Sequence, residues 1–197
     1  MDKHLLGGNS VNMDAILRQI DDAKNLSSVL FDILGVKDIP EVVVQYVYPT
    51  AYNVNRNIIV IKAPFSLCDF NSIFALAHEC FHCFDFGSRQ EKETYSANDR
   101  KIIELYCDEY AYKYDFEKEA TVFACIFVNY FFREIIEYNI GEKMPTISLA
   151  AKNKYPELAD HERKMISIYI DKKNYYIEII SKFKNELLEC YESFVNN

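Results

Sequence analysis

Apolar side chains recur at helical spacing in several stretches of the chain. In Asn12–Leu34 they follow the helical period of about 3.6 residues, and Gly35 directly afterwards is a favourable C-cap. Residues 99–138 hold neither Gly nor Pro, which predicts one long helix or two in succession. Asp160 is the expected N-cap of the last helical region, and Ile166–Val195 is expected to form one long helix or a pair.

A second pattern, typical of strands, lies nearer the amino terminus. Val42–Tyr48 and Asn57–Lys62 are rich in β-branched and aromatic residues. We expect two strands that run antiparallel to each other, joined by a turn that contains Pro49 and Asn53. Several helices with one small antiparallel sheet indicate an α+β fold.

The apolar stretch after these strands predicts a buried helix, and it contains the main chemical signal. The helix is expected to begin at a cap, Asn71 or Ser72, and to end near Gly87. Within it the residues 78–82 spell H-E-x-x-H, and the flanking residues are apolar, as a helix in a domain core requires.

This spacing puts both imidazoles on the same face of a helix. His78 and His82 are four residues apart, so they can hold one side of a zinc ion. Glu79 projects to the side, where it can take a proton from a water that the metal activates. The alternative is that the two histidines are ordinary surface or core residues, but the apolar flanks favour the metal.

Length and composition limit the alternatives. The 197 residues predict one domain, with residues 1–10 flexible and residues 145–197 as a helical extension. The net charge of −8 argues against direct binding of nucleic acid. The sequence contains no run of eighteen apolar residues, so we expect no membrane span. The six cysteines are irregularly spaced and no signal peptide precedes them. We therefore expect free, buried thiols and a cytoplasmic protein.

The third metal ligand is not fixed by the spacing alone. A catalytic zinc usually takes three protein ligands and keeps one position for water. Two downstream segments offer acids at helical spacing, one beginning at Glu104 and the other containing Glu117 and Glu119. Any of these carboxylates could instead belong to a solvated helix face.

A family resemblance favours one of them. The run Ala75–His82 and the later run Glu117–Ala124 resemble the paired motifs of the ImmA/IrrE family of neutral zinc metallopeptidases, over roughly residues 40–130. The resemblance implies a zincin-like, gluzincin-type domain with His78, His82 and Glu117 as zinc ligands and Glu79 as general base. It also implies that the Thr121 hydroxyl orients a ligand.

The resemblance further implies a cytoplasmic zinc-dependent endopeptidase with a protein substrate. That substrate would be a separately encoded helix-turn-helix repressor, and we expect it to lie extended along an edge strand, Asn57–Lys62. Two other functions stay open. Bulky Phe81 inside the motif allows a zinc-containing regulatory or binding module that cuts nothing, and a toxin-like peptidase that attacks a host factor is also possible.

Two further side chains are candidates near the metal. Asp85, three residues beyond His82, could orient a ligand from behind. His161 could stabilise an oxyanion, although a solvent-facing helix start is the simpler interpretation of that segment.

Overall fold

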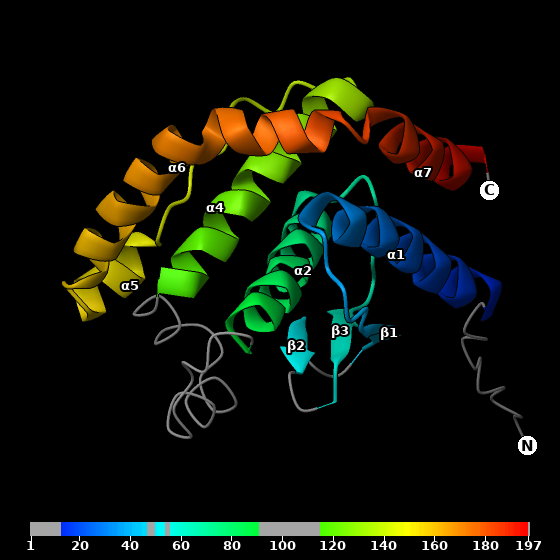
Figure 1. The fold of residues 1–197 in the computed structure, drawn as a ribbon, viewed down its shortest axis with the longest axis horizontal. Coiled ribbons are helices and arrows are strands. Elements are labelled where there is room, and N and C mark those ends of the chain that lie inside the picture. Colours follow the sequence, from blue (N-terminus) through cyan, green and yellow to red (C-terminus); the bar gives the residue numbers. More distant parts are fainter. Residues whose placement is uncertain (1–12, 47–49, 54–55, 91–114, 197) are drawn as a thin grey trace, which may run out of the picture.

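The computed structural model describes residues 13–46, 50–53, 56–90 and 115–196. The molecule is mostly helical with one small sheet, in agreement with the expected α+β class (Figure 1). The helices, in chain order, are α1 (Met13–Leu34), α2 (Phe70–Gln90), α4 (Asp115–Tyr130), the π-helical turn η2 (Phe131–Ile135), α5 (Leu149–Lys154), α6 (Leu158–Ser181) and α7 (Lys184–Asn196).

The sheet is mixed, so the expected antiparallel pair is wrong. Strand β1 (Glu41–Gln45) runs parallel to β3 (Ile58–Lys62), with Val43 opposite Val60. The expected turn contains a further strand, β2 (Ala51–Asn53), which pairs antiparallel with β3 and gives the order β1-β3-β2. Because the chain reverses once into β2 and again into β3, the first and third strands point the same way.

The end of α1 follows the sequence prediction. Gly35 has a φ of +69°, the left-handed conformation that glycine adopts at little cost. The N–H of Val36 donates to the carbonyl of Phe31 at 2.9 Å, the bond that closes a helix in the Schellman arrangement. The helix therefore ends where its apolar pattern ends.

The start of α2 corrects the expected cap. Neither Asn71 nor Ser72 is the capping residue. Instead, the carboxylate of Asp69 accepts two hydrogen bonds from Ser72, one from its backbone N–H at 2.8 Å and one from its hydroxyl at 2.7 Å. Asp69 lies directly before the first helical residue and satisfies a backbone donor that the helix leaves unpaired.

Asp160 is also not the cap that we expected. Helix α6 begins two residues earlier, at Leu158, and Asp160 lies in its first turn, where it forms an ion pair with Arg163. The helix dipole favours a carboxylate in the first turn, so Asp suits the first turn as well as the N-cap position. The expected pair of late helices is confirmed as α6 and α7.

The core is built around α2. Helix α4 packs against one side of α2, and α1 and the sheet pack against the other, while α6 crosses α4 (Figure 1). Ala77, Cys80 and Phe123 are fully buried in this core. None of the helices in the described ranges is both long enough and apolar enough to cross a membrane.

Candidate metal centre

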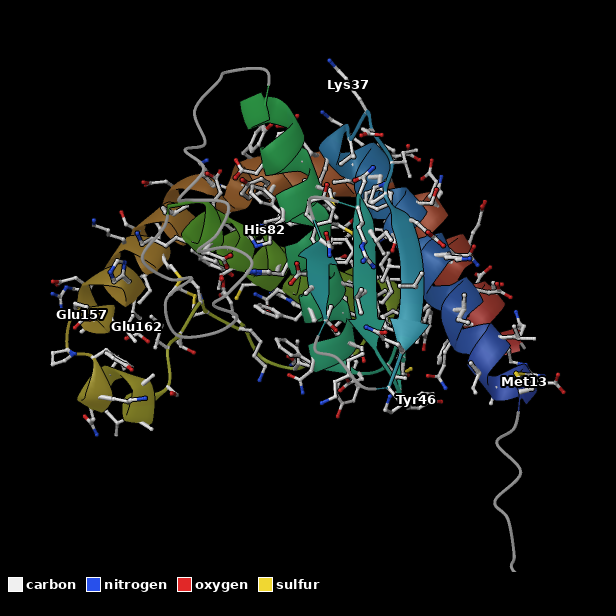
Figure 2. All side chains as sticks on the ribbon, turned by 90° about the horizontal axis from the view of Figure 1, so that it is seen from below. Met13, Lys37, Tyr46, His82, Glu157 and Glu162 are labelled. Atoms are coloured by element: carbon white, nitrogen blue, oxygen red, sulfur yellow. The ribbon has the colours of Figure 1, made fainter. Side chains whose placement is uncertain are left out.

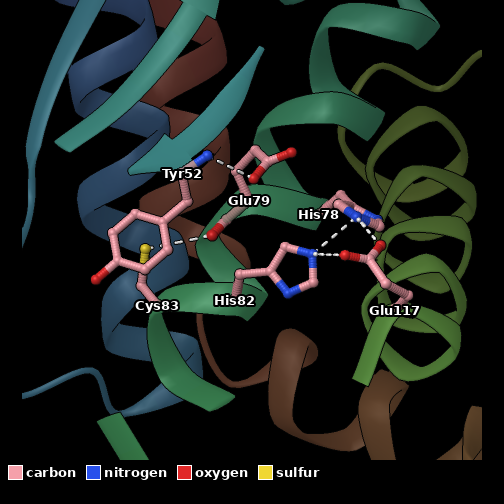
Figure 3. Close-up of polar contacts among 6 residues, drawn as sticks. All are labelled: Tyr52, His78, Glu79, His82, Cys83 and Glu117. Atoms are coloured by element: carbon pink, nitrogen blue, oxygen red, sulfur yellow. Dashed lines mark hydrogen bonds and ion pairs between the residues drawn. The ribbon is translucent and has the colours of Figure 1, made fainter. Parts of the chain in front are cut away.

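Helices α2 and α4 bring three side chains together. The Nε2 atoms of His78 and His82 lie 3.0 Å apart, with the two rings almost perpendicular at 85°. Glu117, 39 positions after His78, places Oε2 at 3.1 Å from the Nε2 of His78 and Oε1 at 3.2 Å from the Nε2 of His82. Figure 3 shows the three groups converging between the two helices.

These separations suit a metal ion. Zinc binds imidazole and carboxylate at about 2.0–2.1 Å, and the corners of a tetrahedron of that radius lie about 3.3 Å apart. The ligand atoms of the cluster all lie within 4.8 Å of one another. Two imidazole nitrogens only 3.0 Å apart repel each other unless a proton or a cation lies between them. The cluster could therefore hold a metal ion.

Burial and charge couple the three groups. Burial alone would raise the pKa of the Glu117 carboxyl, but the hydrogen bonds and charges of His78 and His82 outweigh it and hold that pKa well below its usual range. Burial alone would lower the pKa of His82, and the hydrogen bond and charge of Glu117 reverse the effect, so this pKa is raised. In the absence of a metal the cluster is a proton-binding site, and protons compete with a cation for it.

Glu79 points to the other side of α2, towards the sheet. Its Oε2 accepts the backbone N–H of Tyr52, in β2, at 2.7 Å (Figure 3). Burial raises the pKa of the Glu79 carboxyl, and the charges of His78 and His82 oppose that rise without cancelling it. The residue expected as general base is thus half-buried, directly follows His78 in the chain, and is held by the edge of the sheet.

The other candidates for the third ligand have different positions. Glu119 accepts a hydrogen bond from the Tyr176 hydroxyl at 2.8 Å and forms an ion pair with Lys172, both from α6. Two residues advance a helix by about 200°, so Glu119 faces α6 while Glu117 faces α2. Glu104 lies outside the described residues.

The remaining candidates are not part of the cluster. Thr121 is buried on α4, and within the described ranges its hydroxyl makes no hydrogen bond to the three clustered side chains. His161 lies in the first turn of α6, between Glu157 and Glu162 in the chain, and both of these residues are well separated from His82 in Figure 2. Asp85 is half-buried beyond His82, and its charge raises the pKa of His82 less than Glu117 and Glu79 do.

The cysteines that the structure describes are all free, as expected, but one of them is exposed. Cys80, Cys83, Cys125 and Cys190 are buried and Cys68 is exposed, while Cys107 lies outside the described residues. Burial raises the pKa of both Cys80 and Cys83, which keeps them protonated and unreactive. Neither takes part in the metal cluster.

Sequence reasoning missed Tyr52 as a residue of this site. It contributes its backbone N–H, so no side-chain motif indicates it, and its strand has only three residues. The only sequence feature that could have indicated a short strand here was the pair Ala51 and Tyr52 between the turn-forming residues Pro49 and Asn53.

Comparisons with protein-family models, with curated proteins and with solved structures give no match to this chain. The assignment of the site therefore rests on its residues and their geometry.

Proposed function

We propose that the protein is a zinc-dependent endopeptidase. The observation that supports this most strongly is the convergence of His78, His82 and Glu117 from two helices, with the half-buried carboxylate of Glu79 next to His78 in the chain. Two imidazoles and one carboxylate form a donor set that suits zinc and leaves a position for water.

In this proposal the two histidines and Glu117 hold the metal, and Glu79 moves protons. When bound, zinc would activate a water and polarise the carbonyl of a peptide bond. Glu79 accepts a proton from the attacking water and returns it to the leaving amine. Burial raises the pKa of its carboxyl, which makes the carboxylate a stronger base.

The substrate is proposed to be a protein, and the family resemblance implies a separately encoded helix-turn-helix repressor. Our expectation that it would lie along Asn57–Lys62 needs correction. This segment contains β3, the central strand, whose two edges are already paired with β1 and β2. The outer strands are β1 and β2, and β2 lies beside α2, so we propose that an extended substrate lies along β2.

Bulky Phe81 was the feature that left a zinc-containing module that cuts nothing open as an alternative. This side chain is buried in the core, where its ring lies 5.3 Å from that of Phe123 and 6.4 Å from that of Tyr176. A large residue at this motif position therefore fills space between α2, α4 and α6 and does not occupy the cluster.

Replacement of the general base separates a peptidase from a binding module. We expect Glu79→Gln to lower the cleavage rate of a labelled, unfolded casein by at least about 100-fold, because the amide cannot accept the proton. Zinc content should not change, since Glu79 is not a ligand. Glu119→Gln is the matched control, and it should retain activity because Glu119 faces α6.

Equal cleavage by the wild-type protein and Glu79→Gln would contradict the mechanism. Zinc binding without any cleavage, together with unchanged partner binding in Glu79→Gln, would favour the binding module.

A further inference from the structure

Strand β2 is the outer strand of the sheet on the side of α2. It pairs with β3 through one edge only, with Tyr52 opposite Ile59. The N–H of Tyr52 donates across the other edge to Glu79 at 2.7 Å, so this amide points out of the sheet. A backbone donor that would otherwise face a substrate is thus engaged with the carboxylate next to the metal cluster.

The position of that amide is fixed by three further contacts. The ladder with β3 holds the backbone on one side. The Tyr52 hydroxyl donates to Oδ1 of Asn57 at 2.8 Å, and burial raises the pKa of this phenol to about 12, so it stays protonated. The strand is also tied at its start, where the hydroxyl oxygen of Thr50 accepts the N–H of Lys62 at 3.0 Å.

The bond also distinguishes the two oxygens of the carboxylate. Oε2 of Glu79 accepts the N–H of Tyr52. A proton from water is therefore most easily taken by the other oxygen, Oε1. A carboxylate without a fixed donor could rotate, and a misplacement of about 1 Å in a catalytic group costs on the order of 100-fold in rate.

We propose that the backbone N–H of Tyr52 positions the general base, holding Glu79 through Oε2 so that Oε1 is the oxygen that exchanges protons with water and the leaving amine. Tyr52 is thus a positioning residue of the site, acting through Glu79. The catalytic part of this inference rests on the proposed peptidase function, whereas the contact itself does not.

Amide hydrogen exchange tests the contact without any substrate. In zinc-loaded, ¹⁵N-labelled protein, the Tyr52 N–H should exchange at least about 10-fold more slowly in the wild type than in Glu79→Ala, which removes the acceptor. Glu119→Gln should leave this exchange rate unchanged. Fast exchange of the Tyr52 N–H in the wild type, or equal rates in Glu79→Ala, would overturn the proposal.

Proline at position 52 tests the consequence. An outward-facing N–H of an edge strand can be removed by proline without breaking the ladder, so Tyr52→Pro should fold, which circular dichroism checks. Tyr52→Ala loses the same side chain but keeps the N–H. With labelled casein as substrate, kcat of Tyr52→Pro should be about 10- to 100-fold below that of Tyr52→Ala, with equal KM and equal zinc content.

The exchange measurement and the comparison of Tyr52→Pro with Tyr52→Ala together distinguish failure of this inference from failure of the proposed function. Equal kcat for Tyr52→Pro and Tyr52→Ala would overturn the positioning role. If the wild type cleaves no casein, the peptidase proposal loses its support for that substrate, and the exchange rates still decide whether Tyr52 holds Glu79.

Discussion

Adjacent residues of the H-E-x-x-H motif serve different neighbours, because each step along a helix turns the side chain by about 100°. His78 and His82 face α4, where Glu117 meets them. Glu79 faces the sheet, and Phe81 fills the core. Five consecutive positions of one helix thereby supply two possible ligands, a possible base and part of the packing that holds them.

Away from the site, the buried side-chain amide of Asn129 joins three parts of the chain by hydrogen bonds. It lies on α4, and its side chain accepts the N–H of Lys143 at 2.8 Å and donates to the carbonyl of the same residue at 2.7 Å. It also donates to the hydroxyl of Tyr169, on α6, at 3.1 Å. One side chain therefore binds the segment before α5 to two helices.

We expect Asn129→Ala to lower the free energy of unfolding by about 2–3 kcal/mol, because it leaves partly buried backbone groups without partners. Urea denaturation measures this loss. Asn139→Ala is the control and should cost less than about 1 kcal/mol, since among the described residues the Asn139 side chain accepts only the exposed N–H of Gly141, at 3.1 Å. Equal losses in the two variants would contradict the bridging role of Asn129.

At the scale of elements, the position of α2 decides the position of the site. The helix begins after Asp69, is buried through Ala77 and Cys80, and packs between α4 and the sheet. The cap at the N-terminus of α2 helps to position the site because His78 lies only about two turns further along the helix.

We expect Asp69→Ala to destabilise the protein by about 1 kcal/mol, since it removes the cap of α2. Ser72→Ala retains the bond from its own N–H to Asp69 and loses only the hydroxyl contact, so its cost should be smaller. Both values come from urea denaturation, and a larger cost for Ser72→Ala would show that Asp69 is not the main cap.

The elements also show which features the sequence could predict. Helix α1 and its end at Gly35 follow from local pattern and from the conformational freedom of glycine. Strand β2 was missed because three residues between turn formers do not show an alternating pattern. The parallel pairing of β1 with β3 was missed for the same reason, because it depends on the reversal that β2 introduces.

At the scale of the whole molecule, the cluster depends on how α4 packs against α2. The spacing of His78 and His82 is local and could be predicted, whereas Glu117 is 39 residues from His78. Only the family resemblance favoured Glu117 over Glu104 and Glu119. Local pattern could not choose, since the choice between Glu117 and Glu119 depends on which helix lies on which face of α4.

The late helices offer a test of how the molecule depends on pH. Glu162, on α6, accepts the N–H of Ile147 at 2.8 Å and binds the ammonium of Lys152 at 2.6 Å. Burial alone would raise the pKa of Glu162, but these contacts outweigh it, so the pKa is lowered. A lowered pKa in the folded state adds stability above the unfolded pKa, and that stability is lost as pH falls through the folded pKa.

We therefore expect Glu162→Gln to reduce stability at pH 7 by about 1 kcal/mol, mainly through loss of the ion pair. The difference from the wild type should shrink between pH 7 and an acidic pH, as the pH falls through the folded-state pKa and the wild-type carboxyl takes up a proton. Urea denaturation at both pH values measures it, with exposed Glu157→Gln as control (Figure 2). A difference that grows on acidification would have the wrong sign for this contact.

The zinc-to-protein ratio after zinc loading and dialysis tests the central claim most directly. The wild type should retain about one zinc per chain, whereas His82→Ala and Glu117→Gln should retain almost none, because three ligands are needed to hold the ion. Glu119→Gln should retain about one, since its side chain binds Lys172 and Tyr176 and faces away from the cluster. A wild-type protein that retains no zinc, or equal retention in Glu117→Gln and Glu119→Gln, would contradict the account.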